Sequence, residues 1–170
     1  MRDTVDEVIE RWDAVRPGLD TEPIGVVLRI FRASRHLDQG IKGYFDEHGL
    51  ETWEYDILTT LLRAGGGNAL RMSDLAGAAM ISPAALTNRV DRLVAKGLVT
   101  RATDPDNRRL VRTELTAEGS RIAEDLIEGH LANERELIDG LTPQESRQLA
   151  SLLRKLLVPF EGESRETESP

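Results

Sequence analysis

The sequence predicts a mainly α-helical fold with one small β-hairpin, and three observations carry that prediction. Apolar residues recur at helical spacing through most of the 170 residues. The period changes to alternation in only two short runs, 98–103 and 110–115, which flank the turn-rich segment 104–107 (Asp-Pro-Asp-Asn). Gly and Pro stand where helices are expected to end or begin. The chain is long enough for one domain with appended segments.

The N-terminal part predicts three helices. Residues 3–16 form an amphipathic pattern that Pro17-Gly18 ends. A longer helix is expected from Thr21-Glu22-Pro23 to about 47. A third is expected over about 53–63, with Thr52 as its cap. A loop should follow at 65–68 (Gly-Gly-Gly-Asn). It is not a phosphate loop, because no Gly-Lys-Ser/Thr follows and no strand precedes it.

The middle of the chain predicts two short helices before the hairpin. Ser73-Asp74 can cap a helix over about 74–79. Ser82 as N-cap and Pro83 in the first turn open the second, over 83–96, and Gly97 ends it. Its apolar face is expected to consist of Leu86, Val90, Leu93 and Val94.

Two helices are expected after the hairpin. Thr116 can cap one that runs to about 139, and Thr142 to Glu145 form a capping box with Pro143 in the first turn of the last. Residues 161–170 are polar and acidic and are expected to fray. The last helix is expected to pack through its leucines, namely Leu149, Leu152, Leu153, Leu156 and Leu157.

The charge is distributed unevenly along the chain. A net charge of −8 and a pI of about 5.0 argue, taken alone, against a nucleic-acid partner. Residues 71–115, however, hold eight basic and five acidic side chains, a net +3, and the rest of the chain holds −11. Such asymmetry is a hint of nucleic-acid contact, although a chance fluctuation explains it equally well at this stage.

The composition disfavours several other classes. With zero cysteines there can be no disulfide, thiolate metal site or thiol redox sensor. The histidines, His36, His48 and His130, lack metal-site spacing, and no Gly-x-Ser-x-Gly motif is present. We therefore expect no enzyme, metal or cofactor. There is no apolar run of membrane-spanning length and no secretory signal at the N-terminus, so we expect a cytoplasmic protein without membrane contact.

Residues 72–116 carry the functional prediction. Two helices joined by a tight turn and followed by a basic hairpin have the order of a winged helix-turn-helix, in which the second helix enters the major groove. Small and polar side chains on the outer face of 83–96 suit base edges and phosphates, and two adjacent hairpin arginines suit a minor groove. The candidate DNA-binding residues are Ser82, Ala84, Ala85, Thr87, Asn88, Arg89, Arg92, Arg108 and Arg109.

Several motifs in this region resemble the MarR family of transcription regulators. They are Leu75-Ala76, Ser82-Pro83, Leu86-Thr87, 90–93 (Val-Asp-Arg-Leu), 97–101 (Gly-Leu-Val-Thr-Arg), 104–109 (Asp-Pro-Asp-Asn-Arg-Arg) and 115–119 (Leu-Thr-Ala-Glu-Gly). The family usually has Asp, which often braces the wing arginines, where Asn107 stands. Asp104 or Asp106 can substitute here, or the wing is looser.

The resemblance implies a mainly α single domain over 1–170 that acts as a homodimer. It implies an extra N-terminal helix at 1–20, dimerisation helices at 21–64 and 117–158, a DNA-binding unit at 70–116 and a flexible tail at 159–170. It also implies a pseudo-palindromic double-stranded operator, from which a small ligand releases a repressor.

A narrower resemblance, to the urate-responsive and PecS-like branch of that family, rests on the extra helix with Trp12 and the segment up to Asp20. It implies a site for a small anion such as urate or xanthine, made by Trp12, Asp56, Arg63 and Arg101. Asp56 and Arg63 are two turns apart on one helix, so they share a face. Arginine forks suit planar oxygens, and an indole suits a planar ring. The alternative for these residues is ordinary packing, surface charge and phosphate contact.

A second functional class also fits a helical fold with a hairpin. Such a chain could be a protein-interaction module whose winged helix no longer binds DNA. That alternative predicts apolar or acidic residues on the outer face of 83–96, where this sequence has Thr87, Asn88, Arg89 and Arg92. The polar face and the wing arginines therefore favour the DNA-binding interpretation.

Overall fold

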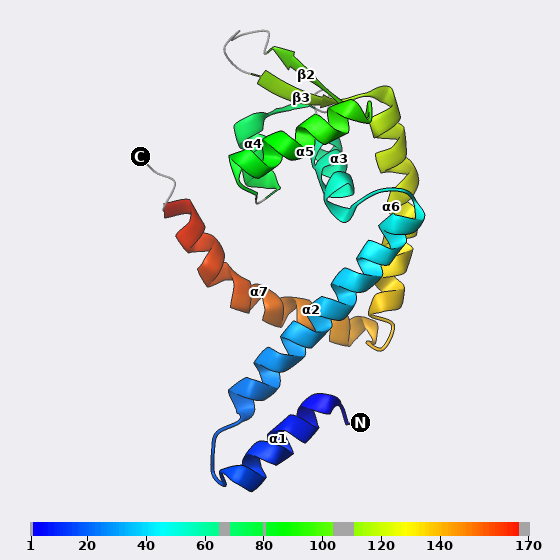
Figure 1. Cartoon of the computed structure of the whole chain (residues 1–170). Coiled ribbons are helices and arrows are strands. Elements are labelled where there is room, and N and C mark those ends of the chain that lie inside the picture. The colour runs from blue at the N-terminus through cyan, green and yellow to red at the C-terminus, as the bar shows by residue number, and fades with distance from the viewer. Residues whose placement is uncertain (1, 65–68, 80, 104–110, 167–170) are drawn as a thin grey trace. The chain divides into compact units, whose positions relative to one another are not determined.

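The structure is a computed structural model that describes residues 2–64, 69–79, 81–103 and 111–166 (Figure 1). Residues 1–133 and 134–170 form two compact units. The elements are α1 (Thr4–Val15), α2 (Glu22–Glu47), α3 (Thr52–Arg63), β1 (Ala69–Arg71), α4 (Met72–Ala78), α5 (Pro83–Ala95), β2 (Val99–Thr103), β3 (Val111–Leu115), α6 (Ala117–Leu137) and α7 (Pro143–Glu166).

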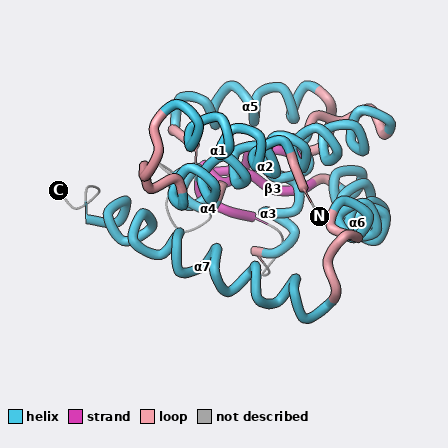
Figure 2. Tube along the Cα trace, turned by 90° about the horizontal axis from the view of Figure 1, so that it is seen from below, coloured by secondary structure: helices cyan, strands magenta, loops and turns pink. Residues whose placement is uncertain are grey.

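The predicted fold class is confirmed, since helices dominate and only three short strands accompany them (Figure 2). The strands pair antiparallel in the order β1-β3-β2, with Arg101 opposite Thr113 and Leu70 opposite the same threonine on the other side. β1 was not expected. Its three residues are too short to display an alternating pattern, and only pairing with β3 reveals it.

The first two helices are joined by ion pairs. Asp3 caps α1 by accepting from the backbone nitrogens of Val5 and Asp6. Arg29 of α2 then donates to Asp3 (2.8 Å) and to Asp6 (2.6 Å). These contacts hold the start of α1 against the N-terminal half of α2.

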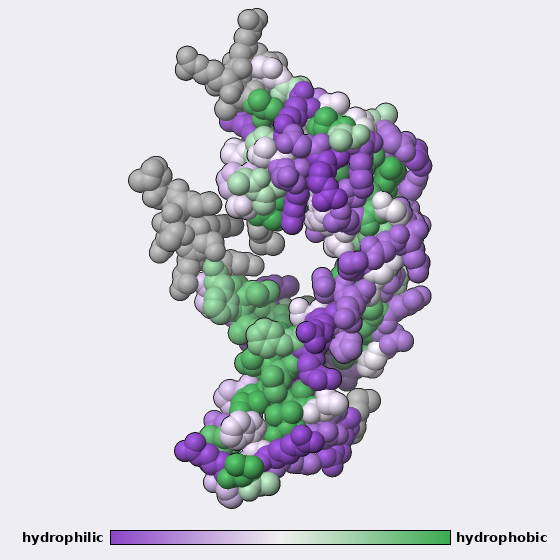
Figure 3. All heavy atoms as spheres, in the orientation of Figure 1, coloured by the Kyte–Doolittle hydropathy of each residue, from purple (hydrophilic) through white to green (hydrophobic). Residues whose placement is uncertain are grey.

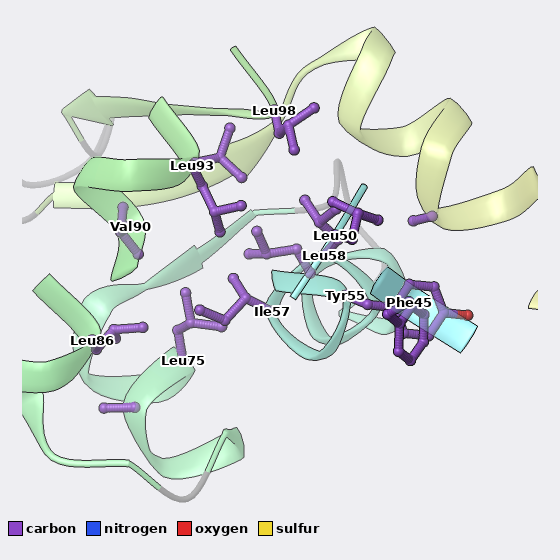
Figure 4. Close-up of a cluster of buried hydrophobic side chains, with 14 residues drawn as sticks. Phe45, Leu50, Tyr55, Ile57, Leu58, Leu75, Leu86, Val90, Leu93 and Leu98 are labelled. Atoms are coloured by element: carbon purple, nitrogen blue, oxygen red, sulfur yellow. The ribbon is translucent and has the colours of Figure 1, made fainter. Parts of the chain in front are cut away.

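The core lies where α3, α4 and α5 meet the sheet. Leu58, Leu75, Leu86, Val90 and Leu93 are completely buried there, and Figure 4 shows their side chains directed toward one another from three helices. Each fully buried aliphatic side chain contributes about 1.5–3 kcal/mol of hydrophobic stabilisation. This cluster therefore fixes α5 on α3 and α4 and leaves the opposite side of α5 outward.

Two glycines are required at the junction between α5 and α6. Gly97 ends α5 with φ +72°, a left-handed conformation that side chains rarely adopt. At Gly119 an added Cβ would lie 2.0 Å from the carbonyl oxygen of Leu98. Thr116 caps α6 as predicted, because its hydroxyl accepts from the Gly119 nitrogen at 3.0 Å.

Several predicted helix starts are confirmed, and two are wrong. Ser82 caps α5, and Thr142 and Glu145 form the predicted box at the start of α7. α3 is capped by Glu51 rather than Thr52, because Glu51 and Glu54 exchange bonds in a box of their own. α4 begins at Met72 after Arg71, so Ser73-Asp74 lies inside the helix and does not cap it. The predicted loops at 65–68 and 104–107 lie outside the described residues.

α7, in the second unit, differs from the prediction in two ways. Leu149, Leu152, Leu156 and Leu157 were expected to be packed, yet they are 43% to 62% exposed in the single chain. Figure 3 shows hydrophobic side chains at the surface along this helix. The helix also continues to Glu166, into the segment that was expected to fray. An exposed apolar face of this length is unusual on a monomeric protein.

Candidate nucleic-acid interface

The start of α5 is built as predicted. The Ser82 hydroxyl accepts from the Ala85 backbone nitrogen at 3.3 Å, and the Ser82 carbonyl accepts from Leu86 at 2.9 Å. The hydroxyl hydrogen remains available to donate to an oxygen outside the protein. Ser82, Ala84 and Ala85 are exposed, so the first turn offers a small, accessible surface with the positive end of the helix dipole.

The two faces of α5 differ as predicted, except at one position. Leu86, Val90 and Leu93 are buried, whereas Thr87 and Asn88 are exposed on the outer side. Val94 was expected to face inward, but it is 41% exposed. Its position is about 100° around the helix from Leu93, which places it beyond the edge of the buried stripe.

The Thr87 hydroxyl already makes one hydrogen bond. Its hydroxyl donates to the Pro83 carbonyl at 3.0 Å, and its own carbonyl accepts from Arg101 at 3.3 Å. The oxygen of the hydroxyl keeps its acceptor capacity. Thr87 can therefore accept from a base amino group without rotating away from the helix, while donation to a base would require exchange of the Pro83 bond.

The two predicted arginines of α5 face α3 rather than pointing straight out. The guanidinium carbons of Arg89 and Arg92 lie 5.4 Å and 4.8 Å from the centre of the Trp53 ring. Arg92 also forms an ion pair with Glu51. The sequence did not predict that Trp53 and Glu51 receive these arginines. The available signals were a tryptophan and the Glu51–Glu54 spacing at the start of α3.

The wing is described only along its strands. The predicted arginines Arg108 and Arg109, and Asn107 with its neighbouring aspartates, lie outside the described residues. At the base of the wing, Arg101 of β2 forms an ion pair with Asp91 of α5 at 2.7 Å. Arg101 therefore links the base of the wing to α5.

Asp56 and Arg63 of the predicted effector site share one side of α3. Thr60 lies between them, donating to the Asp56 carbonyl at 2.7 Å and accepting from Arg63 at 3.4 Å. Neighbouring groups partly desolvate the Asp56 carboxyl, which raises its pKa. The nearby His130, Arg63 and Arg89 oppose that effect. His130, for which the sequence predicted no metal or catalytic role, thus belongs to the surroundings of Asp56.

Trp12 lies far from Asp56 and Arg63 within one chain, and Arg101 contacts α5. It is 43% exposed on α1, which lies along the N-terminal half of α2 (Figure 1). α3 packs at the other end of α2, where the Phe45 and Tyr55 ring centres are 4.5 Å apart. The part of α2 between Arg29 and Phe45 alone spans roughly 24 Å. One chain therefore does not assemble the whole predicted set.

The structure also contains a cavity of ≈ 560 Å³ that none of the predicted effector residues lines. It lies between the end of α2, the end of α5 and the start of α6, and its lining includes His48, Lys96 and Arg121. Arg121 is already bound by Glu118 (2.6 Å) and Asp125 (2.7 Å). These carboxylates neutralise the cation that an anionic ligand would need.

Two further findings concern the described residues only. Within those ranges, no three His, Asp or Glu side chains converge as metal ligands would. None of the helices described there is long and apolar enough to cross a membrane.

Comparison with known proteins places this geometry in a family. The family model described as "MarR family" matches residues 50–111. The HTH-type transcriptional regulator PecS of Dickeya dadantii is 34% identical over 89% of this chain and 92% of its own length.

Solved structures of DNA-binding proteins share this fold. Sco3205 of Streptomyces coelicolor, a MarR family transcriptional regulator in complex with DNA, is 27% identical, with a TM-score of 0.74 over 81% of this chain and 87% of its own. BpsR of Bordetella bronchiseptica, whose DNA binding is regulated by 6-hydroxynicotinic acid, is 27% identical, with a TM-score of 0.69 over 82% and 96%. Together with the capped α5 and its three-stranded wing sheet, these matches show that the chain belongs to the MarR family of DNA-binding transcriptional regulators.

Proposed function

We propose that two copies of this chain form a dimer that inserts both α5 helices into successive major grooves of a pseudo-palindromic operator and represses transcription there, in the cytoplasm. The observation that carries the proposal is the outer face of α5. It presents Ser82, Ala84, Ala85, Thr87 and Asn88 to solvent over a fully buried apolar face. Small side chains allow close approach to the groove floor, and the hydroxyl and amide groups can pair with base edges.

The exposed apolar side chains support dimerisation. On α2, Val26, Val27 and Phe31 are 55%, 48% and 68% exposed. On α7, Leu152 and Phe160 are 62% and 63% exposed. Monomeric proteins rarely leave such surfaces uncovered. The N- and C-terminal helices, 21–64 and 117–158, thus supply the dimer contacts, and 70–116 supplies the DNA-binding unit.

Different residues serve different parts of the DNA contact. Ser82 at the helix N-terminus donates to a phosphate, while Thr87 and Asn88 contact base edges. Arg108 and Arg109 of the wing enter the adjacent minor groove, where the negative potential favours arginine.

The effector is a small anion or an aromatic acid of the urate or xanthine type. It binds at Asp56, Arg63 and Arg101, and the Trp12 side chain that covers it comes from the second subunit, because α1 and α3 of one chain lie at opposite ends of α2. The regulation of BpsR by 6-hydroxynicotinic acid, an aromatic acid, supports this class of effector. An anion that takes Arg101 competes with Asp91, whose ion pair ties the wing to α5. Loss of that tie changes how helix and wing are spaced on DNA.

One experiment tests DNA binding itself. The protein is mixed with fragments of its own genome, and the selected duplexes are titrated at several salt concentrations. We expect affinity to fall steeply with salt, since each phosphate contact releases counterions. If no fragment binds even at low salt, the proposal is wrong and the interaction-module alternative gains support.

A second experiment tests the effector site. Urate and related anions are screened for release of the selected duplex from wild-type protein and from Arg63→Ala. We expect release of the duplex from Arg63→Ala to require at least about tenfold more ligand than release from the wild type, because one charge-assisted contact to the anion is lost. Equal release from both proteins contradicts the assignment of Arg63. Arg135→Ala, on α6, is the matched control.

A further inference from the structure

The flank of α5 that faces α3 carries a stripe of three cations. Arg89, Arg92 and Lys96 are spaced so that they follow one side of the helix. The first turn of α3 receives all three. Lys96 contacts Glu54 at 2.6 Å, Arg92 pairs with Glu51, and both arginines lie over the Trp53 ring.

Glu51 is held in place for this contact. One of its carboxylate oxygens accepts from the Trp53 indole nitrogen at 2.7 Å, and the other pairs with Arg92. The indole bond, followed by Arg92, lowers the pKa of Glu51, so the carboxylate is ionised throughout the neutral range. Glu51 also caps α3 through its reciprocal bonds with Glu54, which fixes its backbone.

Glu51 and Trp53 together offer Arg92 the kinds of contact that DNA would offer. An ionised carboxylate resembles a phosphate as a charged acceptor, and an indole face resembles a base as a stacking surface for guanidinium. An arginine that already has both partners gains little by moving to a loosely placed phosphate.

The two ion pairs between α3 and α5 differ in their exposure to water. Glu54 is completely buried, so its pair with Lys96 is a fixed part of the core edge. The side chains of Arg92 and Glu51 are 49% and 50% exposed, and such pairs are weak and readily exchanged. Only the second pair is suited to open when DNA arrives.

We propose that Glu51 and Trp53 are specificity-determining residues that hold Arg92 away from DNA until a well-fitting operator displaces it. Non-specific duplex leaves Arg92 on Glu51, so this cation adds nothing to non-specific affinity. The operator places a phosphate or a base edge within reach of Arg92 while the rest of α5 is seated, and the exchange then takes place. The proposal rests on the DNA-binding function proposed above.

The test compares Glu51→Gln with wild type on a random duplex and on the selected operator. Gln keeps an oxygen for the indole bond and the helix cap but loses the charge that holds Arg92. We expect the variant to bind random duplex more tightly, with a salt slope steeper by about two in the dimer, one per freed Arg92. The ratio of the variant's affinity for random duplex to that of the wild type should fall by about tenfold between 50 and 200 mM salt. Operator affinity should rise less, so the ratio of specific to non-specific affinity falls.

Matched variants separate this effect from a general change of charge. Glu47→Gln removes an exposed carboxylate of α2 only four positions away and should leave the ratio unchanged. In the double variant Glu51→Gln/Arg92→Gln the gain on random duplex should disappear. The proposal is overturned if Glu51→Gln behaves like Glu47→Gln, if it binds random duplex more weakly, if both affinities rise equally, or if the gain persists without Arg92. Failure of wild type to bind any duplex refutes the proposed function instead.

A spectroscopic measurement does not depend on the stability of these variants. The chain has two tryptophans, so Trp12→Phe leaves Trp53 as the sole tryptophan, which is excited selectively at a wavelength where tyrosine does not absorb. When operator is added, Arg92 should leave the Trp53 ring, and the emission of Trp53 should change. Random duplex should leave the emission of Trp53 unchanged. The same response to both duplexes, or none to either in a protein that binds operator, contradicts the proposal.

Discussion

Replacing Lys96 by Met tests the buried half of the contact between α3 and α5. Glu54 has no exposed surface, and its carboxylate lies 2.6 Å from the Lys96 ammonium. Its other bond comes from the backbone nitrogen of Glu51 at 3.0 Å. Removing the ammonium leaves a buried carboxylate with one neutral donor, and the loss of a partner from a buried pair costs about 3–5 kcal/mol.

The exposure of Lys96 reduces that figure. Its side chain is 42% exposed, so water can partly solvate the carboxylate once the ammonium is gone. We therefore expect Lys96→Met to lower the free energy of unfolding by about 2–3 kcal/mol, which is less than the cost for a fully buried pair. The midpoint of thermal unfolding should fall by about 5–10 °C for a chain of this size.

Urea unfolding followed by circular dichroism at fixed protein concentration measures this loss, because the stability of a dimer depends on concentration. Lys42→Met is the matched control. Lys42 pairs with Asp46 at 2.6 Å, but both side chains are more than half exposed, and we expect a loss below about 0.5 kcal/mol. The double variant Glu54→Gln/Lys96→Met should recover at least half of the stability that Lys96→Met loses, because it no longer has an unpaired buried charge. If Lys96→Met and Lys42→Met unfold alike, the buried pair does not hold α5 to α3.

Three further outcomes are expected. Gly119→Ala should destabilise by about 1–3 kcal/mol in thermal melts, because its Cβ would meet the Leu98 carbonyl at 2.0 Å. Gly43→Ala, in open space on α2, should instead stabilise by about 0.5–1 kcal/mol. The Arg29 contact lowers the pKa of Asp3, so its stabilising effect is present above the ordinary value of 3.8 and is lost as pH falls through the lowered pKa. Fluorescence of the tryptophan on α1 should then change below pH 4, and a response centred above pH 5 contradicts this cause.

Local patterns predicted most of the elements. Capping at Ser82, Thr116 and Thr142 depends on residues three positions apart, and helical spacing identified Leu86, Val90 and Leu93 as buried. These features depend on contacts between near neighbours in the sequence, which a period or a capping rule describes directly.

The contact between α3 and α5 could not be predicted in this way. Glu51 and Arg92 are 41 positions apart, and Glu54 and Lys96 are 42 apart. No spacing rule links residues at such separations, so the arginines of α5 were assigned to DNA, and no contact between them and the first turn of α3 was predicted. The exposure of the α7 leucines was missed for a related reason, because a helical pattern shows that a face will be covered but does not show which chain covers it.

The partners of these cations change the meaning of the charge distribution. Residues 71–115 carry a net +3, yet at least four of their eight basic side chains are engaged by carboxylates or the Trp53 ring within the chain. Arg89, Arg92 and Lys96 lie on the first turn of α3, and Arg101 lies on Asp91. The attraction available to a passing phosphate is therefore smaller than the count of basic residues suggests, while the remaining −11 repels DNA elsewhere. Non-specific affinity should be low for both reasons. Operator binding must then come from the fit of the small, polar outer face of α5, and the engaged cations become available only after that fit is made.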